Sequence, residues 1–282
     1  MIVAVASGKG GTGKTSIACA LAQSAGGEVC LLDCDVDEPN AHILLRPDIS
    51  RTFPATILLP YVDESKCDGC GDCARVCEYH ALTVLGGRPL LFDHLCHSCG
   101  GCALACPRHA ISERAKAIGK ISVGDAGAIR FIAGELNVGE AMCPPVIRQV
   151  RAQANGCRNV VIDSPPGTSC PMVTAVRGSD CCILVTEPTP FGLHDLTLAV
   201  DVVRKLGLSF GVVVNIADIG DDGVERYCRD QGIEILARIP YDRVVAEAYS
   251  RGRSIVEAKP EYRAVFVGLF QRIRKLAEVG CS

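Results

Sequence analysis

The sequence predicts an α/β protein built on a doubly wound, mostly parallel sheet. Apolar, β-branched runs recur along the chain at 2–6, 29–33, 159–163, 181–186, 210–215 and 233–238. Stretches with helical periodicity alternate with them at 14–25, 143–155, 191–206 and 222–231. This alternation favours parallel pairing, because a helix forms the crossover between successive strands. A chain of 282 residues is long enough for one such domain and a small second module.

The first predicted strand is followed at once by a glycine-rich loop, G-K-G-G-T-G-K-T at 8–15. Strand, loop and helix in this order fit the pattern G-x4-G-K-[ST], in which backbone N–H groups and a helix N-terminus surround a phosphate. Lys14 is then placed to neutralise the β- and γ-phosphates, and the Thr15 hydroxyl to bind Mg2+. The predicted nucleotide-binding residues of this segment are Gly8, Gly10, Gly11, Thr12, Gly13, Lys14, Thr15 and Ser16.

Two later apolar strands lead into acidic residues. The strand at 29–33 is followed by Asp35 and Asp37, and the strand at 159–163 ends at Asp163, before S-P-P-G-T. Phosphoryl transfer requires a carboxylate at the end of a strand near Mg2+, which Asp163 supplies. Gly167 is predicted to leave a backbone N–H free to sense the γ-phosphate.

Cysteine usage indicates metal or redox chemistry rather than disulfides, since 18 cysteines occur in a chain without a secretory signal. Eight of them form two runs of identical spacing, C-x2-C-x2-C-x3-C, at 67–77 and 96–106. In proteins with two [4Fe-4S] clusters, three cysteines of one run share a cluster with the fourth of the other. The predicted sets are Cys67, Cys70, Cys73 and Cys106 for one cluster, and Cys96, Cys99, Cys102 and Cys77 for the other. Zinc is the alternative, because C-x2-C pairs also form structural zinc sites.

These runs resemble bacterial two-cluster ferredoxins, although Glu78 follows Cys77 where that pattern usually has proline. We expect a small α+β bacterial-type ferredoxin domain at 61–115, inserted into a discontinuous domain formed by 1–60 and 116–282. The four histidines of the insert are expected to be polar surface residues rather than iron ligands, because all the thiolates are already present. They are His80, His94, His97 and His109.

The loop K-G-G-T-G-K-T resembles the deviant phosphate loop of the MinD, ParA, Mrp and nitrogenase iron protein superfamily, P-loop ATPases. The resemblance implies that Lys9 reaches across a dimer interface to the partner's nucleotide; a solvated lysine is the alternative. The segment at 34–40 resembles the first switch, and Asp35, or alternatively Asp37, is implied to orient the attacking water. The segment D-S-P-P-G-T at 163–168 resembles the second switch of the Mrp branch. Asn215 is implied to read the adenine, unless it only caps a loop.

Two cysteines outside the insert suggest a third cluster. Cys170 follows the second switch, and Cys143 precedes an amphipathic stretch. In the nitrogenase iron protein, a cysteine in the first of these positions and another upstream hold a cluster on the dimer axis. The resemblance therefore implies that Cys143 and Cys170 of two chains can share a bridging [4Fe-4S] cluster; structural cysteines are the alternative.

Charge and hydropathy exclude other classes of partner. The formal net charge of −3 leaves no overall basic field for nucleic acid. No run reaches the roughly 18 apolar residues of a membrane span, and the N-terminus lacks a secretory pattern. The apolar stripe of the last helix, near 261–279, predicts core packing, although MinD itself ends in a membrane-binding helix. We therefore expect a cytoplasmic protein with no nucleic acid or membrane partner.

Two functions remain open from the sequence. The first is a slow, partner-coupled ATPase whose nucleotide-driven dimer switch is coupled to electron transfer through [4Fe-4S] clusters, between a redox donor and an acceptor protein. The second is an ATP-dependent assembly or carrier protein for iron–sulfur or metal clusters, of the Mrp type, which serves an apo-metalloprotein client. Both use ATP/ADP, Mg2+ and two [4Fe-4S] clusters per chain, in a homodimer or a heterodimer with a related ATPase.

Overall fold

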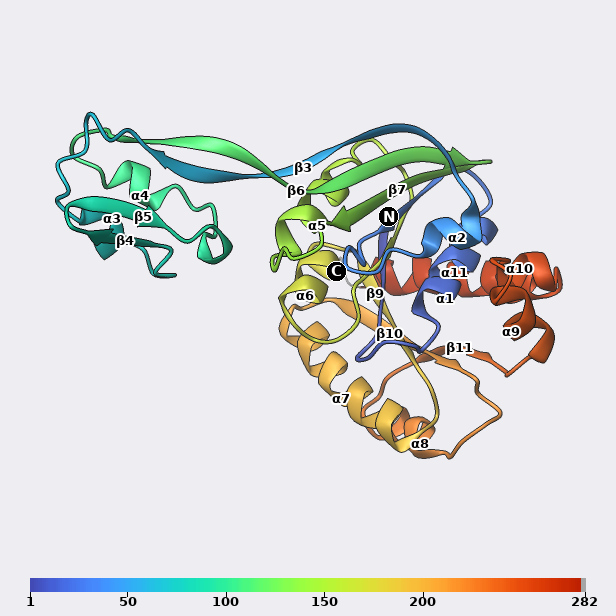
Figure 1. Cartoon of the computed structure of the whole chain (residues 1–282). Helices are drawn as coiled ribbons and strands as arrows, with labels where there is room; N and C mark the ends of the chain where they lie inside the picture. The colour runs from blue at the N-terminus through green and yellow to red at the C-terminus, as the bar shows by residue number, and fades with distance from the viewer. Residues whose placement is uncertain (280–282) are drawn as a thin grey trace.

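A doubly wound sheet forms the body of the protein in the computed structural model, which describes residues 1–279 (Figure 1). Its strand order is β11-β10-β9-β1-β8-β2-β7-β6-β3. Pairing is parallel from β11 to β7 and antiparallel where β6 and β3 complete one edge. The prediction of a mostly parallel α/β sheet is confirmed. The strands are β1 (Ile2–Ala6), β2 (Val29–Asp33), β3 (Asp48–Val62), β6 (Ile111–Ala126), β7 (Ile129–Leu136), β8 (Val160–Asp163), β9 (Cys181–Thr186), β10 (Ser209–Asn215) and β11 (Ile235–Ile239).

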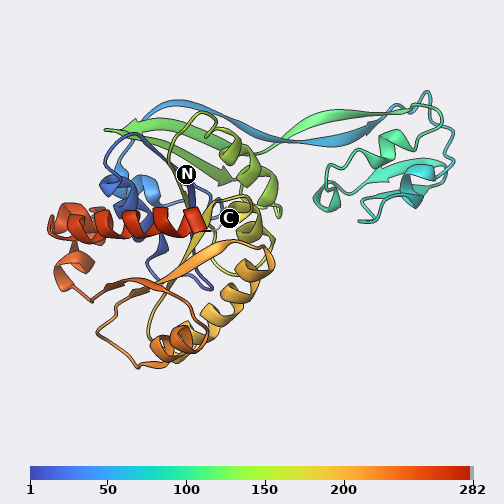
Figure 2. The same cartoon turned by 180° about the vertical axis from the view of Figure 1, so that it is seen from behind.

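Helices cover both faces of the sheet, and a separate apolar core lies under each layer (Figures 1 and 2). One layer includes α1, α2, α10 and α11, and the other includes α5, α6, α7 and α8. In α11, Phe266, Leu269 and Ile273 are almost completely buried, so the predicted core packing of the last helix is confirmed. The helices of the body are α1 (Lys14–Ser24), α2 (Ala41–Leu45), α5 (Pro144–Ala152), α6 (Cys170–Val176), α7 (Pro190–Lys205), α8 (Gly223–Asp230), α9 (Arg243–Tyr249), α10 (Ile255–Ala258) and α11 (Tyr262–Val279).

The long strands β3 and β6 leave the body as a two-stranded arm (Figure 1). They pair along their whole length, from Asp48 opposite Asp125 to Val62 opposite Ile111. However, β7 pairs with β6 only from Gly119 onward. We call the pair formed by 56–62 and 111–117 the arm. Pro54 and Pro60 lie within β3, where an edge strand tolerates a missing N–H donor.

The arm carries a small cysteine-rich unit, residues 63–110, at its outer end (Figure 1). A hairpin formed by β4 (Leu82–Leu85) and β5 (Arg88–Leu91) packs with two single-turn helices and a 3-10 turn. The two helices, α3 (Asp72–Arg75) and α4 (Gly101–Leu104), each follow a glycine in the left-handed region, Gly71 and Gly100. The backbone therefore repeats itself across the two cysteine runs.

The helices within residues 1–279 do not combine the length and apolar character that a membrane crossing requires.

Candidate functional site

A cleft of about 470 Å3 opens at the carboxyl edge of the sheet, between the glycine-rich loop and the segment after β11. Gly10, Gly11, Gly13, Lys14, Thr15 and Ser16 line it, as the sequence predicted for a shared site. Gly13 has a φ of +86°, and a Cβ there would collide with the side-chain amide of Asn215. Glycine is required at this position because both the conformation and the close approach exclude a side chain.

Lys14 begins α1 and points into a buried group of carboxylates. Its Nζ lies 2.8 Å from Asp163 Oδ1 and 3.6 Å from Asp35 Oδ2. Burial opposes the charge of Lys14, but the neighbouring Asp163, Asp35 and Asp33 prevail and raise its pKa. The structure thus brings together three residues that lie far apart in the sequence.

This group fits a divalent cation. Three aspartates, Asp33, Asp35 and Asp163, face one lysine, so the fully ionised group has surplus negative charge. Two buried oxygens, Asp163 Oδ2 and Thr12 Oγ1, have no hydrogen-bond partner among the described residues. Buried polar atoms are normally satisfied, and a cation near Asp163 would satisfy such an atom and offset the charge.

The loop after β2, residues 34–40, is organised by Asp33, which the sequence reading did not single out. Asp33 Oδ2 accepts hydrogen bonds from the backbone N–H groups of Asn40 (3.1 Å) and Ala41 (3.0 Å), at the start of α2. Burial and the adjacent Asp163 raise the pKa of Asp33. The only sequence feature that could have indicated this role of Asp33 is its position, a carboxylate at the end of a strand and shortly before a helix.

Asp35 and Asp37 have different surroundings. Asp35 lines the cleft, and burial raises its pKa to about 6 despite the nearby Lys14. Asp37 instead accepts a hydrogen bond from the Cys143 thiol, at 3.0 Å. Only Asp35 of these two is therefore placed to contact a ligand in the cleft.

The backbone N–H of Gly167, which the sequence predicted to be free to sense the γ-phosphate, is in a different state. It is not free, because it donates to the Ser7 carbonyl at 3.0 Å. The segment after β8 is thus tied to the glycine-rich loop, and contact of this N–H with a phosphate would require that bond to break. Pro166, next to it, lines the cleft.

Asn215 ends β10 at the far side of the glycine-rich loop and also lines the cleft. Its side-chain amide donates to the Thr12 carbonyl at 2.9 Å. The cleft continues past Asn215 to residues at the end of β11, in the segment after it and in the last helices. No sequence motif pointed to these residues as part of a site: Ile239, Pro240, Tyr241, Val245, Tyr249 and Phe266.

Lys9 is paired within its own chain. Its Nζ lies 3.6 Å from Glu187 Oε2, and both side chains are partly exposed. Exposed ion pairs contribute about 0–1 kcal/mol, so this pairing opposes a different position of Lys9 only weakly. Gly8, beside it, packs directly against the backbone of Asp195 in α7.

Two further cavities lie in the cysteine-rich unit, and each is lined by one predicted set of four cysteines. Cys67, Cys70, Cys73 and Cys106 line the first; Cys77, Cys96, Cys99 and Cys102 line the second. Among the residues that the structure describes, no three or more Cys, His, Asp or Glu side chains form a group for a single metal ion.

The fourth cysteine of each run accepts a hydrogen bond from a backbone N–H at 3.3 Å, Cys77 from Ala81 and Cys106 from Ala110. Such N–H groups stabilise thiolates bound to a cluster. Apolar side chains close the walls, including Val84 and Ile111 in the first cavity. Four thiols, apolar walls and N–H donors to sulfur fit a four-iron cluster in each cavity.

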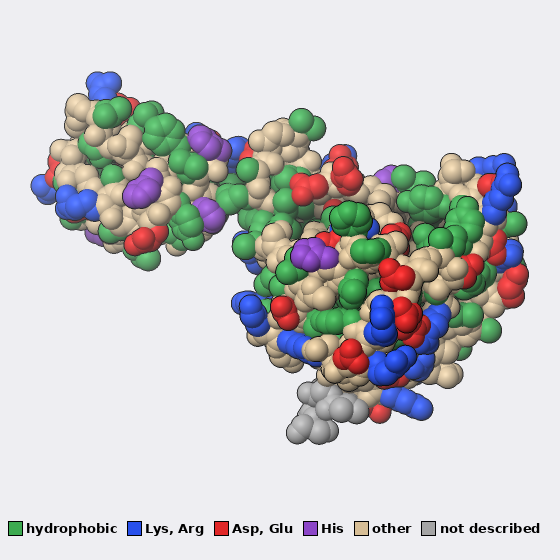
Figure 3. All heavy atoms as spheres, turned by 90° about the horizontal axis from the view of Figure 1, so that it is seen from below, with side chains coloured by type: hydrophobic (Ala, Val, Ile, Leu, Met, Phe, Trp, Pro, Cys, Tyr) green, Lys and Arg blue, Asp and Glu red, His purple; other side chains and the backbone are tan. Residues whose placement is uncertain are grey.

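The histidines of the unit are exposed, as expected, and gather on its surface (Figure 3). His97 also stacks on Tyr79, with ring centroids 3.5 Å apart, and both rings border the second cavity.

Cys143 and Cys170 occupy different environments. Cys170 is exposed at the start of α6, whereas Cys143 is 7% exposed and donates to Asp37. Burial, and to a smaller extent the hydrogen bond with Asp37, raises the pKa of the Cys143 thiol to about 12. A cluster on the surface would therefore require Cys143 to leave this contact.

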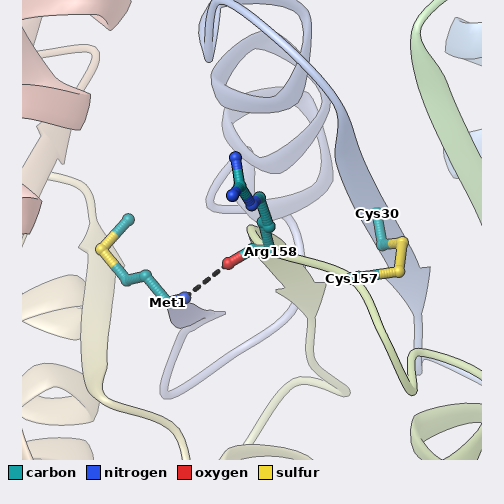
Figure 4. Close-up of a disulfide and its surroundings, with 4 residues drawn as sticks. All are labelled: Met1, Cys30, Cys157 and Arg158. Atoms are coloured by element: carbon teal, nitrogen blue, oxygen red, sulfur yellow. Dashed lines mark hydrogen bonds between the residues drawn. A yellow bond between two sulfur atoms is a disulfide. The ribbon is translucent and has the colours of Figure 1, made fainter.

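A disulfide joins Cys30 in β2 to Cys157, just before β8 (Figure 4). The expectation of metal or redox chemistry rather than disulfides is wrong for this pair, because the loop before β8 brings Cys157 to within 6.3 Å of Cys30, measured between the Cα atoms. Nearby, the N-terminal amino group of Met1 donates to the Arg158 carbonyl at 2.6 Å (Figure 4).

A glycine-rich loop that leads into α1, at the carboxyl edge of a doubly wound sheet and with a buried lysine facing strand-end aspartates, defines a P-loop nucleotide-binding protein. The chain belongs to the CobQ/CobB/MinD/ParA nucleotide-binding domain family, whose profile matches residues 3–255.

Similar proteins extend this assignment. An uncharacterised protein of Methanocaldococcus jannaschii is 30% identical over 91% of this chain and 92% of its own length. An iron-sulfur cluster carrier protein of Pyrococcus horikoshii is 31% identical over 43% of this chain and 46% of its own. The fold is that of the septum site-determining protein MinD of P. horikoshii, solved with Mg-ADP. The TM-score between the two structures is 0.61 at 20% sequence identity, and the alignment covers 99% of this chain and 98% of that chain.

Proposed function

We propose that this protein binds and hydrolyses ATP and uses its nucleotide state to control the loading and release of iron–sulfur clusters. The observation that carries the proposal is the grouping of eight cysteines into two four-thiol cavities on an arm of a P-loop domain. The partial similarity to an iron-sulfur cluster carrier supports this function over the others.

In the nucleotide site, the backbone of Gly10, Gly11 and Gly13 would hold the phosphates, with Lys14 as their counter-charge. Mg2+ would be held by Thr15 and by the group around Asp163, and it would supply neutralisation of the phosphate charge. Asp35 would orient the attacking water from its position on the cleft wall. Asn215 would contact the base.

Dimerisation would move Lys9 from Glu187 to the nucleotide of the partner, in a homodimer or with a related ATPase. The weak Lys9–Glu187 pair makes this exchange inexpensive. Inverting a 1:99 population requires about 5.5 kcal/mol of differential affinity, and several charge-assisted hydrogen bonds to a γ-phosphate supply energies of that order.

Electron transfer through resident clusters is the second candidate. It is favoured by the completeness of each cavity, since one chain supplies all four thiols and the N–H donors to Cys77 and Cys106. A third cluster bridging two chains through Cys143 and Cys170 is a further hypothesis. It predicts that Cys170→Ala lowers the iron content by roughly four per dimer; an unchanged iron content would contradict it.

The fate of iron separates the two functions. Protein reconstituted without oxygen is incubated with an apo iron–sulfur acceptor and either MgATP or MgADP, and iron and sulfide are then counted on both proteins. Transfer that depends on MgATP supports the carrier. Retention of all the iron through many turnovers, with an EPR signal that responds to MgATP, supports electron transfer.

Two matched variants complete the experiment. Cys70→Ala removes one thiol of a cavity and is expected to lower iron binding, whereas Cys19→Ala, in the core of the body, leaves it unchanged. Equal iron in the two variants, or zinc in place of iron, would overturn the proposal.

A further inference from the structure

The loop 34–40 packs directly against α5. Val36 is buried, and its carbonyl accepts a hydrogen bond from the Leu136 N–H at 2.8 Å. The side chains of Val36, Val146 and Val150 meet over Gly134, where a Cβ would lie within about 3 Å of all three. A displacement of Val36 is therefore transmitted to the apolar face of α5, because close-packed side chains leave no space to absorb it.

A polar contact reinforces this packing at the start of α5. Cys143 occupies the N-cap position of the helix and donates its thiol hydrogen to Asp37 Oδ2. Asp37 lies two residues from Asp35, which lines the nucleotide cleft. The start of α5 thus contacts the loop that lines the cleft.

Nearly two turns further along, α5 contacts the arm. Gln149 Nε2 donates to the Thr56 carbonyl at 2.9 Å, and Thr56 N–H donates to Gln149 Oε1 at 3.1 Å. One side chain therefore satisfies both backbone groups of a residue in the edge strand. The contact lies at the register shift between Ala55 and Thr56.

The loop between β7 and α5 holds the other strand of the arm at the same level. Asn137 N–H donates to the Ile118 carbonyl at 2.9 Å, and Lys116 pairs with Glu140 at 2.9 Å. Ala117, between them, lies opposite Thr56. Both strands of the arm are thus held by α5 and the loop before it where the arm leaves the body.

We propose that α5 and the loop before it form a lever that couples the nucleotide state of loop 34–40 to the position of the cysteine-rich unit, with Cys143 and Gln149 as positioning residues at its two ends. This inference rests on the proposed function, because it assumes that a bound nucleotide moves the loop. From Thr56 to Val62 the arm extends about 20 Å, at about 3.3 Å per residue. A rotation of about 10° at its root would move the unit by about 3.5 Å over that length.

Hydrogen exchange measures this coupling directly. Full-length protein with reconstituted clusters is compared with MgATP, with MgADP and without nucleotide. We expect MgATP to change exchange in the loop 8–15 and also in 48–62 and 111–126. In Gln149→Leu, the change at 8–15 should persist while the change in the arm is lost, because leucine cannot bond the Thr56 backbone. Arg148→Gln, on the exposed face of α5, should behave as wild type.

Cys143 provides a second, independent pair of variants. Cys143→Ser keeps a hydrogen-bond donor for Asp37 and should retain the response of the arm, whereas Cys143→Ala should lose it. If MgATP leaves the arm of the wild-type protein unchanged, or if Gln149→Leu retains the full response, the lever is wrong. The proposed function fails separately. ATP-dependent iron transfer by Gln149→Leu at the wild-type rate would refute the lever alone, whereas an arm that responds to MgATP without any iron transfer would refute the carrier alone.

Discussion

Replacing Lys14 by alanine tests the electrostatics of the nucleotide site before any nucleotide is added. In the nucleotide-free protein, Lys14 is the cation 2.8 Å from the fully buried Asp163, with Asp35 at 3.6 Å. Removing one partner of a buried ion pair costs about 3–5 kcal/mol, because the other charge stays buried without compensation. Little discount for solvent applies, since Lys14 is only 6% exposed. We therefore expect Lys14→Ala to lower the free energy of unfolding by about 3–5 kcal/mol at pH 8.

The sign of the pH dependence makes the test specific. Without the lysine, Asp33 and Asp35, whose pKa values burial already raises, face Asp163 with no nearby opposing charge, and protonation of Asp33 or Asp35 relieves the repulsion. The stability deficit of Lys14→Ala should therefore shrink as the pH falls from 8 to 5.5, measured by urea unfolding at both values. Lys205→Ala, an exposed lysine at the end of α7, should stay within about 0.5 kcal/mol of wild type.

Nucleotide binding supplies the second readout. A ligand at 100 times its Kd stabilises the folded state by about 2.7 kcal/mol, and this gain from MgATP should be absent in Lys14→Ala. Equal stability of Lys14→Ala and wild type at pH 8, or stabilisation of the variant by MgATP, would refute the reasoning.

The other predictions concern separate parts of the molecule. Lys9→Ala should keep nucleotide affinity but lose dimer-dependent hydrolysis, and an unchanged turnover rate would contradict the cross-dimer role. Asp35→Ala should bind MgATP without cleaving it. Burial raises the pKa of Asp35 to about 6, so the contribution of this group to the wild-type free energy of unfolding falls as the pH rises from about 4 through 6, and the variant should lack that slope. Gly134→Ala should lower stability by about 1–3 kcal/mol through overpacking, whereas Gly268→Ala, in open space on α11, should be neutral or stabilising, as thermal melts can show. Cys30→Ser should lose up to about 5 kcal/mol, and dithiothreitol should lower the Tm of wild type but not of this variant.

Periodicity predicted six of the seven parallel strands, because buried strands such as β2 and β9 are uninterrupted apolar runs. The predicted runs did not include β7 or β3. The strand β3 has one face in solvent along the arm, and Pro54 and Pro60 interrupt its pattern. An edge strand is specified by its partner β6 rather than by its own propensity, so periodicity alone did not reveal it.

In the candidate site, the motifs located Gly13 and Lys14, which line the cleft, and Asp163, which ends β8 and contacts Lys14. Contacts between distant residues were not predictable. Gln149 meets Thr56, and Cys30 meets Cys157, only because the sheet and α5 bring them together. A glutamine on an amphipathic helix has no sequence feature that distinguishes a structural contact from a solvated surface position.

The place of the arm in the sheet bears on the proposed lever. The strand β2 leads into loop 34–40, and the sheet continues from it as β2-β7-β6-β3. The root of the arm is therefore only two to three strands from the loop, about 10–15 Å at the usual strand spacing, and α5 packs across this interval, touching β2, β7, β6 and β3. An insertion at the other edge, beyond β11, would have β11, β10, β9, β1 and β8 between it and β2. Its location next to β7 thus allows one short helix to contact both the nucleotide-facing loop and the support of the cysteine-rich unit.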